Sequence, residues 1–271
     1  KDLIRGMKNN DIDGLIIDLR NNGGGSLLEA NALAHLFLGA GTKVQVKTSS
    51  GSIHGLGERR GFQFYDGPLA ILVNRFSASA SEILAGAIQD YERGLILGTD
   101  TFGKGTVQRV QALSSGQIKF TESKFYRVSG KSTQSKGISP DIYLPSPINT
   151  EEFGENKLPG ALEYDFIAKI RVRDFNRLNT STSLLSSEHE IRVNDSFLFK
   201  HHKKLKAWRK TQQEEKYLVL DLEIRKAKKE NNLFMLEETQ EGLINVLKQT
   251  NNLEALSNTY DSYIETKEKL D

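Results

Sequence analysis

The chain of 271 residues contains no cysteine, which excludes disulfide bonds, thiolate catalysis and cysteine-based metal sites. It also lacks any run of about 18 consecutive apolar residues, so the sequence predicts no membrane-spanning helix. The chain also has no large excess of positive or negative charge, because it contains 37 Lys and Arg residues and 35 Asp and Glu residues. A formal net charge of +2 argues against nucleic acid as the main partner.

Histidine is scarce, and none of the five histidines stands in a catalytic or metal-binding motif. The sequence has no Gly-x-Ser-x-Gly elbow, no His-Glu-x-x-His motif and no acidic loop with calcium-binding spacing. We therefore predict no metal, no cofactor and no Ser-His-Asp triad. We interpret all five histidines as structural or solvated residues: His35, His54, His189, His201 and His202.

Short apolar runs alternate with helical patterns over the first hundred residues, which favours crossover connections and a largely parallel sheet. Three of the runs are apolar enough to predict strands buried on both faces. A glycine-rich stretch around His54 is interpreted as a loop. The predicted strands cover residues 14–19, 42–47, 69–73 and 94–98, and the predicted helices cover residues 27–38 and 81–91.

The pattern changes twice after residue 105. Residues 107–113 and 117–128 predict a β-hairpin around Ser114, Ser115 and Gly116. Beyond about residue 156 glycine becomes rare and charges become dense, so we predict an α/β core over 1–150 and a helical domain over 151–271. Helices in that domain are predicted over 162–176, 195–210, 215–229 and 252–269.

Three short strings carry the chemistry. Asp18–Gly25 follows an apolar strand and ends in three glycines, whose backbone N–H groups could face a reacting oxygen. Asn74–Glu82 places a serine at the start of a helix, and Thr101–Gln108 places a lysine in a glycine-flanked turn. A serine and a lysine in such positions suit nucleophilic catalysis without histidine.

Together and in this order, the three strings resemble the catalytic core of the tail-specific (C-terminal processing) serine proteases. The resemblance covers about residues 14–145, and a looser one continues through the helical region of the longer bacterial members. It implies a crotonase/ClpP-like α/β protease core. It also implies that an N-terminal region and a PDZ domain precede this chain in a longer protein, an expectation that fits the absence of an initial Met and of a signal peptide.

Ser79 is the candidate nucleophile. Ser79 and Glu82 also fit a capping box, so a plain helix cap is the alternative, and Ser77 and Ser81 compete for either role. Two features support a catalytic role. A buried strand leads into small residues there, and a helix N-terminus favours a developing oxyanion. The resemblance places the nucleophile at Ser79.

Lys104 is the candidate general base. A lysine in water has a pKa of about 10.4 and is protonated at neutral pH, so a lysine base must be desolvated next to its serine. Phe102, Gly103 and Gly105 would let the main chain pack closely there. In an extended segment the Gln108 side chain would share a face with Lys104, and the resemblance implies a Ser-Lys-Gln arrangement of Ser79, Lys104 and Gln108.

The oxyanion hole is expected from two backbone amides. Alignment with the family motif selects Gly24, with Gly25 as the second choice, and the other donor would be Ala80. Asp90 stands where the resembling proteases carry an aspartate important to the site, although a solvated charge near a helix end is an equal alternative. A flexible strand-to-helix turn is the structural alternative for the glycines.

The resemblance implies a serine endopeptidase that acts on proteins with an apolar, free C-terminus, in the periplasm. Acyl-CoA chemistry on the related crotonase fold is a second possibility, although it does not need the pair Ser79 and Lys104. A third is an inactive fragment, scaffold or binding module on the protease fold. The helical domain could support the core or contact a partner subunit in an oligomer.

Overall fold

The computed structural model describes residues 2, 4, 6, 12–146, 148, 150–172, 175, 182–217 and 219–249. The chain divides into two compact units, and each is described by itself. The first unit comprises Lys1–Leu144 and Asn149–Ser187, and the second comprises Pro145–Ile148 and Glu188–Asp271.

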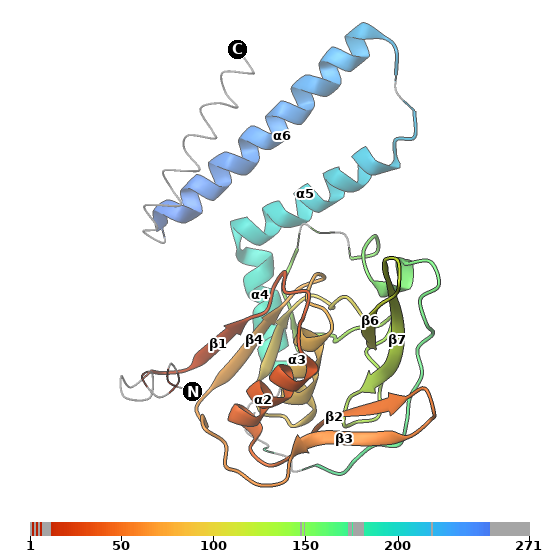
Figure 1. Cartoon of the computed structure of the whole chain (residues 1–271). Helices are drawn as coiled ribbons and strands as arrows, with labels where there is room; N and C mark the ends of the chain where they lie inside the picture. The colour runs from red at the N-terminus through yellow and green to blue at the C-terminus, as the bar shows by residue number, and fades with distance from the viewer. Residues whose placement is uncertain are drawn as a thin grey trace. The chain divides into compact units, whose positions relative to one another are not determined.

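A parallel sheet forms the centre of the first unit (Figure 1). Its strands, in the spatial order β1-β4-β5-β8, are β1 Leu15–Asp18, β4 Leu69–Val73, β5 Leu95–Gly98 and β8 Ile142–Tyr143. Helix α2 (Leu27–Leu38) lies between β1 and β2 in the sequence, and helix α3 (Ala80–Asp90) connects β4 with β5. The predicted parallel sheet with helical connections is therefore confirmed.

Helices α2 and α3 contact each other, and their apolar sides join the inner strands in one core (Figure 1). Spacing of three or four residues puts Phe37 on the buried side of α2, and Leu84 and Ile88 on that of α3. They pack in one cluster with Ile71 of β4 and Ile96 of β5, both completely buried. This core fixes the ends of β4 and α3, where the candidate serine lies.

An antiparallel sheet completes the first unit. Its strands, in the order β3-β2-β7-β6, are β2 Gly41–Thr48, β3 Ile53–Glu58, β6 Thr106–Ala112 and β7 Gln117–Tyr126. Strands β6 and β7 are the predicted hairpin, whose turn uses Gly116 at a φ of 88°. Because β6 is an edge strand, one side of its backbone has no strand partner among the residues that the structure describes.

Two strands differ from the sequence prediction. Strand β3 occupies the segment around His54 that we interpret as a loop, because pairing with β2 outweighs the low strand preference of Gly55 and Gly57. Strand β1 is not buried on both faces, since Ile16 exposes 65% of its surface. It is the edge strand of its sheet, and the described residues leave one of its faces uncovered.

The helix predicted over 162–176 is wrong for the part that the structure describes. Residues 161–172 contain no helix, and Phe166 instead forms an antiparallel bridge with Lys131. The amides of Ile167 and Ile170 donate to the carbonyls of Gly130 and Val128 at 2.9 and 2.8 Å. These bonds tie the segment to the chain that follows β7, so tertiary pairing has overridden a helical spacing.

The remaining helices are long and rich in charge: α4 Thr182–Asp195, α5 Phe197–Glu214 and α6 Leu222–Gln249. Helix α5 confirms the helix predicted over 195–210, whereas α4 was not predicted. Helix α6 begins at Leu222 instead of Glu215 and continues past the predicted end. The helix predicted over 252–269 lies outside the described residues. Within the second unit α5 contacts α6, and His201 shares a 2.9 Å hydrogen bond with Thr239.

Candidate active site

The turn between β4 and α3 carries the candidate nucleophile. Ser79 is the N-cap residue of α3, with φ 58° and ψ −113°, a conformation rare for a residue with a side chain. Its amide donates to Oε2 of Glu82 at 2.8 Å, and the Ala78 amide donates to the Asn22 carbonyl at 3.0 Å. Strained turns held in this way concentrate at functional sites.

The three neighbouring serines have different roles. The Ser77 hydroxyl donates to the Leu19 carbonyl at 2.7 Å, and the Ser81 hydroxyl donates to the Asn22 carbonyl at 3.1 Å. Both hydroxyls therefore tie the turn to the end of β1. Ser79 is half-buried, and of the three it alone lines the pocket that also contains Lys104.

The candidate base lies in the loop that joins β5 to β6. Lys104 is half-buried, and its amide donates to Oε2 of Glu82 at 2.9 Å. The Gly103 amide and the Thr101 hydroxyl donate to the other oxygen of the same carboxylate, at 2.7 and 2.5 Å. On the far side of Lys104, the Gly105 amide donates to the buried Gln134 side chain at 2.9 Å.

Glu82 joins the serine turn to the lysine loop, a role that the sequence did not reveal. Its side chain is completely buried and accepts four hydrogen bonds, one from the serine turn and three from the lysine loop. Burial raises the pKa of Glu82 to about 7, and the hydrogen bonds oppose that rise. The capping-box spacing of Ser79 and Glu82 was the available signal, but it indicated a helix start and gave no sign of the contacts with the loop.

A pocket of about 190 Å³ collects the predicted Ser-Lys-Gln residues. Gln108 of β6 reaches it beside a β-bulge, where Val107 pairs with Ser123 but Gln108 pairs with Thr121. The lining consists of Gly25, Leu27, Ser79, Ala80, Ile83, Lys104, Thr106, Val107, Gln108, Lys119 and Phe125. None of the five histidines is among these residues.

Ser79 and Lys104 share this pocket without a hydrogen bond between the hydroxyl and the ammonium in the part of the chain that the structure describes. Catalytic hydrogen bonds are often long in an unliganded protein and tighten when substrate binds. The backbone is already fixed, because one carboxylate oxygen of Glu82 accepts from both amides. The two backbone segments that carry the pair are therefore joined through one carboxylate.

The glycine string lies against the serine turn. Gly24 has a φ of 100°, and a Cβ atom there would lie 2.6 Å from the Ala78 carbonyl oxygen and 2.8 Å from the Ala80 nitrogen. The Gly24 amide donates to the Asn22 side chain at 2.9 Å, so it is occupied in this structure. Gly25 and Ala80 both line the pocket, and among the described residues neither amide has an acceptor.

Asp90 lies outside this pocket, at the last position of α3. Its carboxylate forms an ion pair with Arg127, in which Nε donates at 3.0 Å, and also accepts from the Ser129 hydroxyl at 3.1 Å. The carboxyl side chain is only 8% exposed, so the alternative of a solvated charge is wrong. The contacts give Asp90 a role in joining the end of α3 to the chain after β7.

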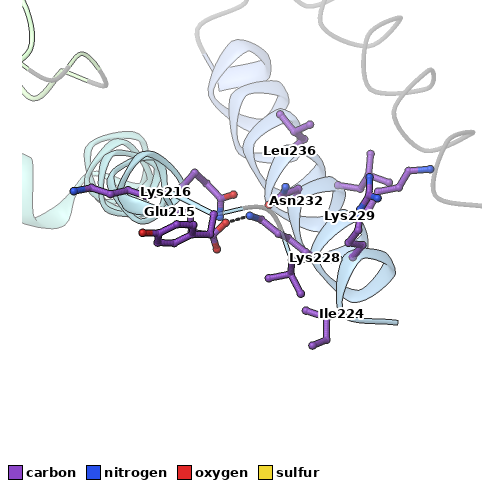
Figure 2. Close-up of a pocket in the computed structure, with 12 residues that line it drawn as sticks. Glu215, Lys216, Ile224, Lys228, Lys229, Asn232 and Leu236 are labelled. Atoms are coloured by element: carbon purple, nitrogen blue, oxygen red, sulfur yellow. Dashed lines mark hydrogen bonds and ion pairs between the residues drawn. The ribbon is translucent and has the colours of Figure 1, made fainter. Parts of the chain in front are cut away.

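A larger pocket of about 580 Å³ lies within the second unit, between the end of α5 and the start of α6. Figure 2 shows Lys228 paired with Glu215, and Lys216 and Lys229 extending in opposite directions away from that pair. The side chains do not converge on a common point, and the lining contains neither serine nor histidine. We therefore place the chemistry in the first unit.

Comparison with known proteins identifies the family. The family model of Peptidase family S41 matches residues 1–144, more than half of the chain. The chain belongs to peptidase family S41. The family model of the C-terminal domain of tail specific protease matches residues 148–271. The resemblance to tail-specific proteases is thereby confirmed.

Two curated relatives carry matching names. A tail-specific protease of Haemophilus influenzae is 39% identical over 245 residues, which cover 86% of this chain and 35% of that protein. A carboxy-terminal-processing protease of Bartonella bacilliformis is 34% identical over 171 residues, covering 60% of this chain and 39% of that protein. The chain thus spans about a third of the length of these S41 relatives.

Solved structures of similar proteins include a photosystem II D1 C-terminal processing protease. It has a TM-score of 0.47 and 37% sequence identity, and the match covers 55% of this chain and 39% of that one. None of the helices that the structure of this S41 member describes has the length and hydropathy needed to cross a membrane.

Proposed function

We propose that this chain carries the catalytic centre of a serine endopeptidase that uses a Ser-Lys dyad. The observation that carries the proposal is that Ser79 and Lys104 line one pocket while their backbone amides donate to the same buried carboxylate oxygen. Membership of a peptidase family supports this assignment. Acyl-CoA chemistry has no need of the pair and is disfavoured.

The proposed reaction has two stages. The Ser79 hydroxyl attacks a peptide carbonyl as the Lys104 amine takes its proton, and the lysine then donates that proton to the leaving amine. Water hydrolyses the resulting ester of Ser79, with Lys104 again accepting a proton, and releases the new carboxylate. Gln108 lines the same pocket and would orient the amine.

The oxyanion would be held by the Ala80 amide and one amide of the glycine loop. The sequence favoured Gly24 over Gly25, and both remain candidates. Gly25 lines the pocket, and its amide has no acceptor among the residues that the structure describes. Gly24 would first have to release the Asn22 side chain. In comparable sites each donor contributes about 3 kcal/mol to transition-state stabilisation.

Substrate and setting are also part of the proposal. The names of the relatives support processing of proteins near their C-termini. Selection of an apolar C-terminus and a periplasmic location belong to the proposal through the family resemblance alone. A PDZ domain in the natural full-length protein would capture that end. The free edge of β6 next to the pocket would accept the substrate as an added strand.

The proposal is tested by mass spectrometry of an unfolded protein with an apolar C-terminus after incubation with the natural full-length protein. Ser79→Ala and Lys104→Ala should each lower cleavage at least about a thousandfold. Ser115→Ala and Lys157→Ala, at exposed positions outside the pocket, serve as matched controls and should keep full activity. Circular dichroism would show that all four variants fold.

Either of two results would reject the mechanism. Cleavage that survives in folded Ser79→Ala would mean that the nucleophile is another residue. A wild-type protein that binds such substrates without cutting them would instead support the alternative of an inactive scaffold or binding module.

A further inference from the structure

The pocket around Ser79 is lined by two lysines and by no carboxylate. One is Lys104, the proposed base. The other is Lys119, an exposed residue of β7 to which the proposed reaction gives no role. Glu82, whose carboxylate joins the serine turn to the lysine loop, is completely buried and already accepts four hydrogen bonds.

Strand register explains how Lys119 reaches the pocket. Lys119 pairs with Val110 and Thr121 pairs with Gln108, so Lys119 and Gln108 project from the same face of the hairpin. A strand added at the edge of β6 would lie two strand spacings, about 9.6 Å, from β7. Lys119 would therefore meet a substrate through the pocket that it lines with Ser79 and Gln108.

The other cations of the hairpin already have partners. Lys124 forms an ion pair with Asp165 at 2.6 Å, and Arg109 pairs with Glu122 at 3.4 Å. Lys119 has no carboxylate partner among the residues that the structure describes. A positive side chain that is left unpaired beside the reacting group attracts an anion supplied by the ligand.

We propose that Lys119 is a specificity-determining residue that binds the side-chain carboxylate of an Asp or Glu in the substrate, close to the scissile bond. This inference rests on the proposed peptidase function and deepens it. The C-terminal carboxylate of the substrate carries the same chemistry, but the pocket lies beside the reacting serine, where internal residues of the substrate must bind.

The test uses pairs of fluorogenic peptides based on a cleavage site found in the unfolded protein. The two peptides of a pair are identical except that one carries Glu and the other Gln at one of three positions on either side of the scissile bond. A copy of each peptide with an amidated C-terminus lacks the terminal carboxylate. The natural full-length protein is compared with Lys119→Gln, Lys119→Glu and Lys119→Arg. Lys157→Gln, a neutralised exposed lysine outside the pocket, is the matched control.

At one position the wild type should have a kcat/KM about fivefold higher for the Glu peptide than for its Gln partner, at low salt. Lys119→Gln should bring that ratio to about one by lowering kcat/KM for the Glu peptide alone. Lys119→Arg and Lys157→Gln should keep the wild-type ratio. Lys119→Glu should reverse the preference for the Glu peptide. A salt concentration of 0.5 M should weaken the wild-type preference, because it shortens the electrostatic screening length to about 4 Å.

Four outcomes overturn the inference. An unchanged ratio in Lys119→Gln would remove Lys119 from recognition, and an equal loss on both peptides would make it part of the reaction machinery. A preference that disappears on amidation would assign the lysine to the terminal carboxylate. Failure of the wild type to cut the unfolded protein at any site would reject the proposed function itself, and this inference with it.

Discussion

The pocket has two walls that are built in different ways. On one side Ser79 and Lys104 belong to backbone segments joined through the completely buried Glu82. On the other side Gln108 and Lys119 are exposed residues of a hairpin at the edge of a sheet. A fully satisfied buried network fixes geometry, whereas exposed side chains tolerate change. Substitutions should therefore cost most in the first wall and least in the second.

Among substitutions that leave Ser79 and Lys104 in place, Gly24→Ala should have the largest effect, because it forces the glycine loop away from the serine turn. The added Cβ would overlap backbone atoms of Ala78 and Ala80, at a φ of 100° that alanine rarely adopts. Displacement of reacting groups by about 1 Å can cost a hundredfold, so kcat/KM should fall at least that much.

Gly23→Ala is the matched control, since a Cβ there meets no atom within 4 Å. It should retain activity within a few-fold of wild type. Equal losses in both variants would mean that flexibility of the loop, and not its close approach to the serine turn, is what the site requires.

Glu82→Gln tests the connection inside the first wall. Each carboxylate oxygen accepts two hydrogen bonds, and the amide group of glutamine would point a donor at two other donors. We expect a loss of about 3 kcal/mol in unfolding free energy and a roughly tenfold to hundredfold fall in kcat. Glu92→Gln, at an exposed glutamate, should change neither, and a fully active Glu82→Gln would contradict the role assigned to Glu82.

The same carboxylate predicts a pH dependence. Burial raises the pKa of Glu82 to about 7 in the folded state, above the ordinary value of 4.5 for a glutamate, so the folded state binds more protons between these pH values. The Glu82 contribution to stability is therefore complete below about pH 4.5 and is lost as the pH rises through about 7.

Urea unfolding at several pH values would measure this contribution. The unfolding free energy of wild type minus that of Glu82→Gln should decrease between pH 5 and pH 8, by on the order of 3 kcal/mol. A difference that stays constant over this range would show that Glu82 does not titrate there.

The contrast between the walls also explains what the sequence could predict. Short apolar runs predicted the parallel sheet, and the family resemblance carried by the adjacent strings predicted that Ser79, Lys104 and Gln108 would meet. Glu82 was missed because three of its four hydrogen bonds come from a loop about twenty residues away, which local spacing does not encode. The segment 161–172 was mistaken for a helix for the same reason, since its partners lie after β7.

Asp90→Asn should have a smaller effect, confined to stability. The variant would leave Arg127, whose side chain is 15% exposed, without its charged partner. Breaking such a pair from one side costs about 3 kcal/mol, which urea unfolding would detect. Replacing both residues, as Asp90→Asn with Arg127→Met, should cost less than the sum of the single changes. Strict additivity would contradict a direct pairing energy.

Gln108→Ala should have the smallest effect, because it alters the exposed wall alone. Loss of the proposed hydrogen bond to the lysine amine should lower kcat/KM about fivefold and leave the unfolding free energy within about 0.5 kcal/mol of wild type. Gln111→Ala is the matched control, since Gln111 pairs with Ile118 and projects from the opposite face of the hairpin. A thousandfold loss of kcat/KM in Gln108→Ala would mean that Gln108 is as necessary for cleavage as Ser79 and Lys104. The two walls of the pocket would then differ in how deeply they are buried but not in their importance for activity.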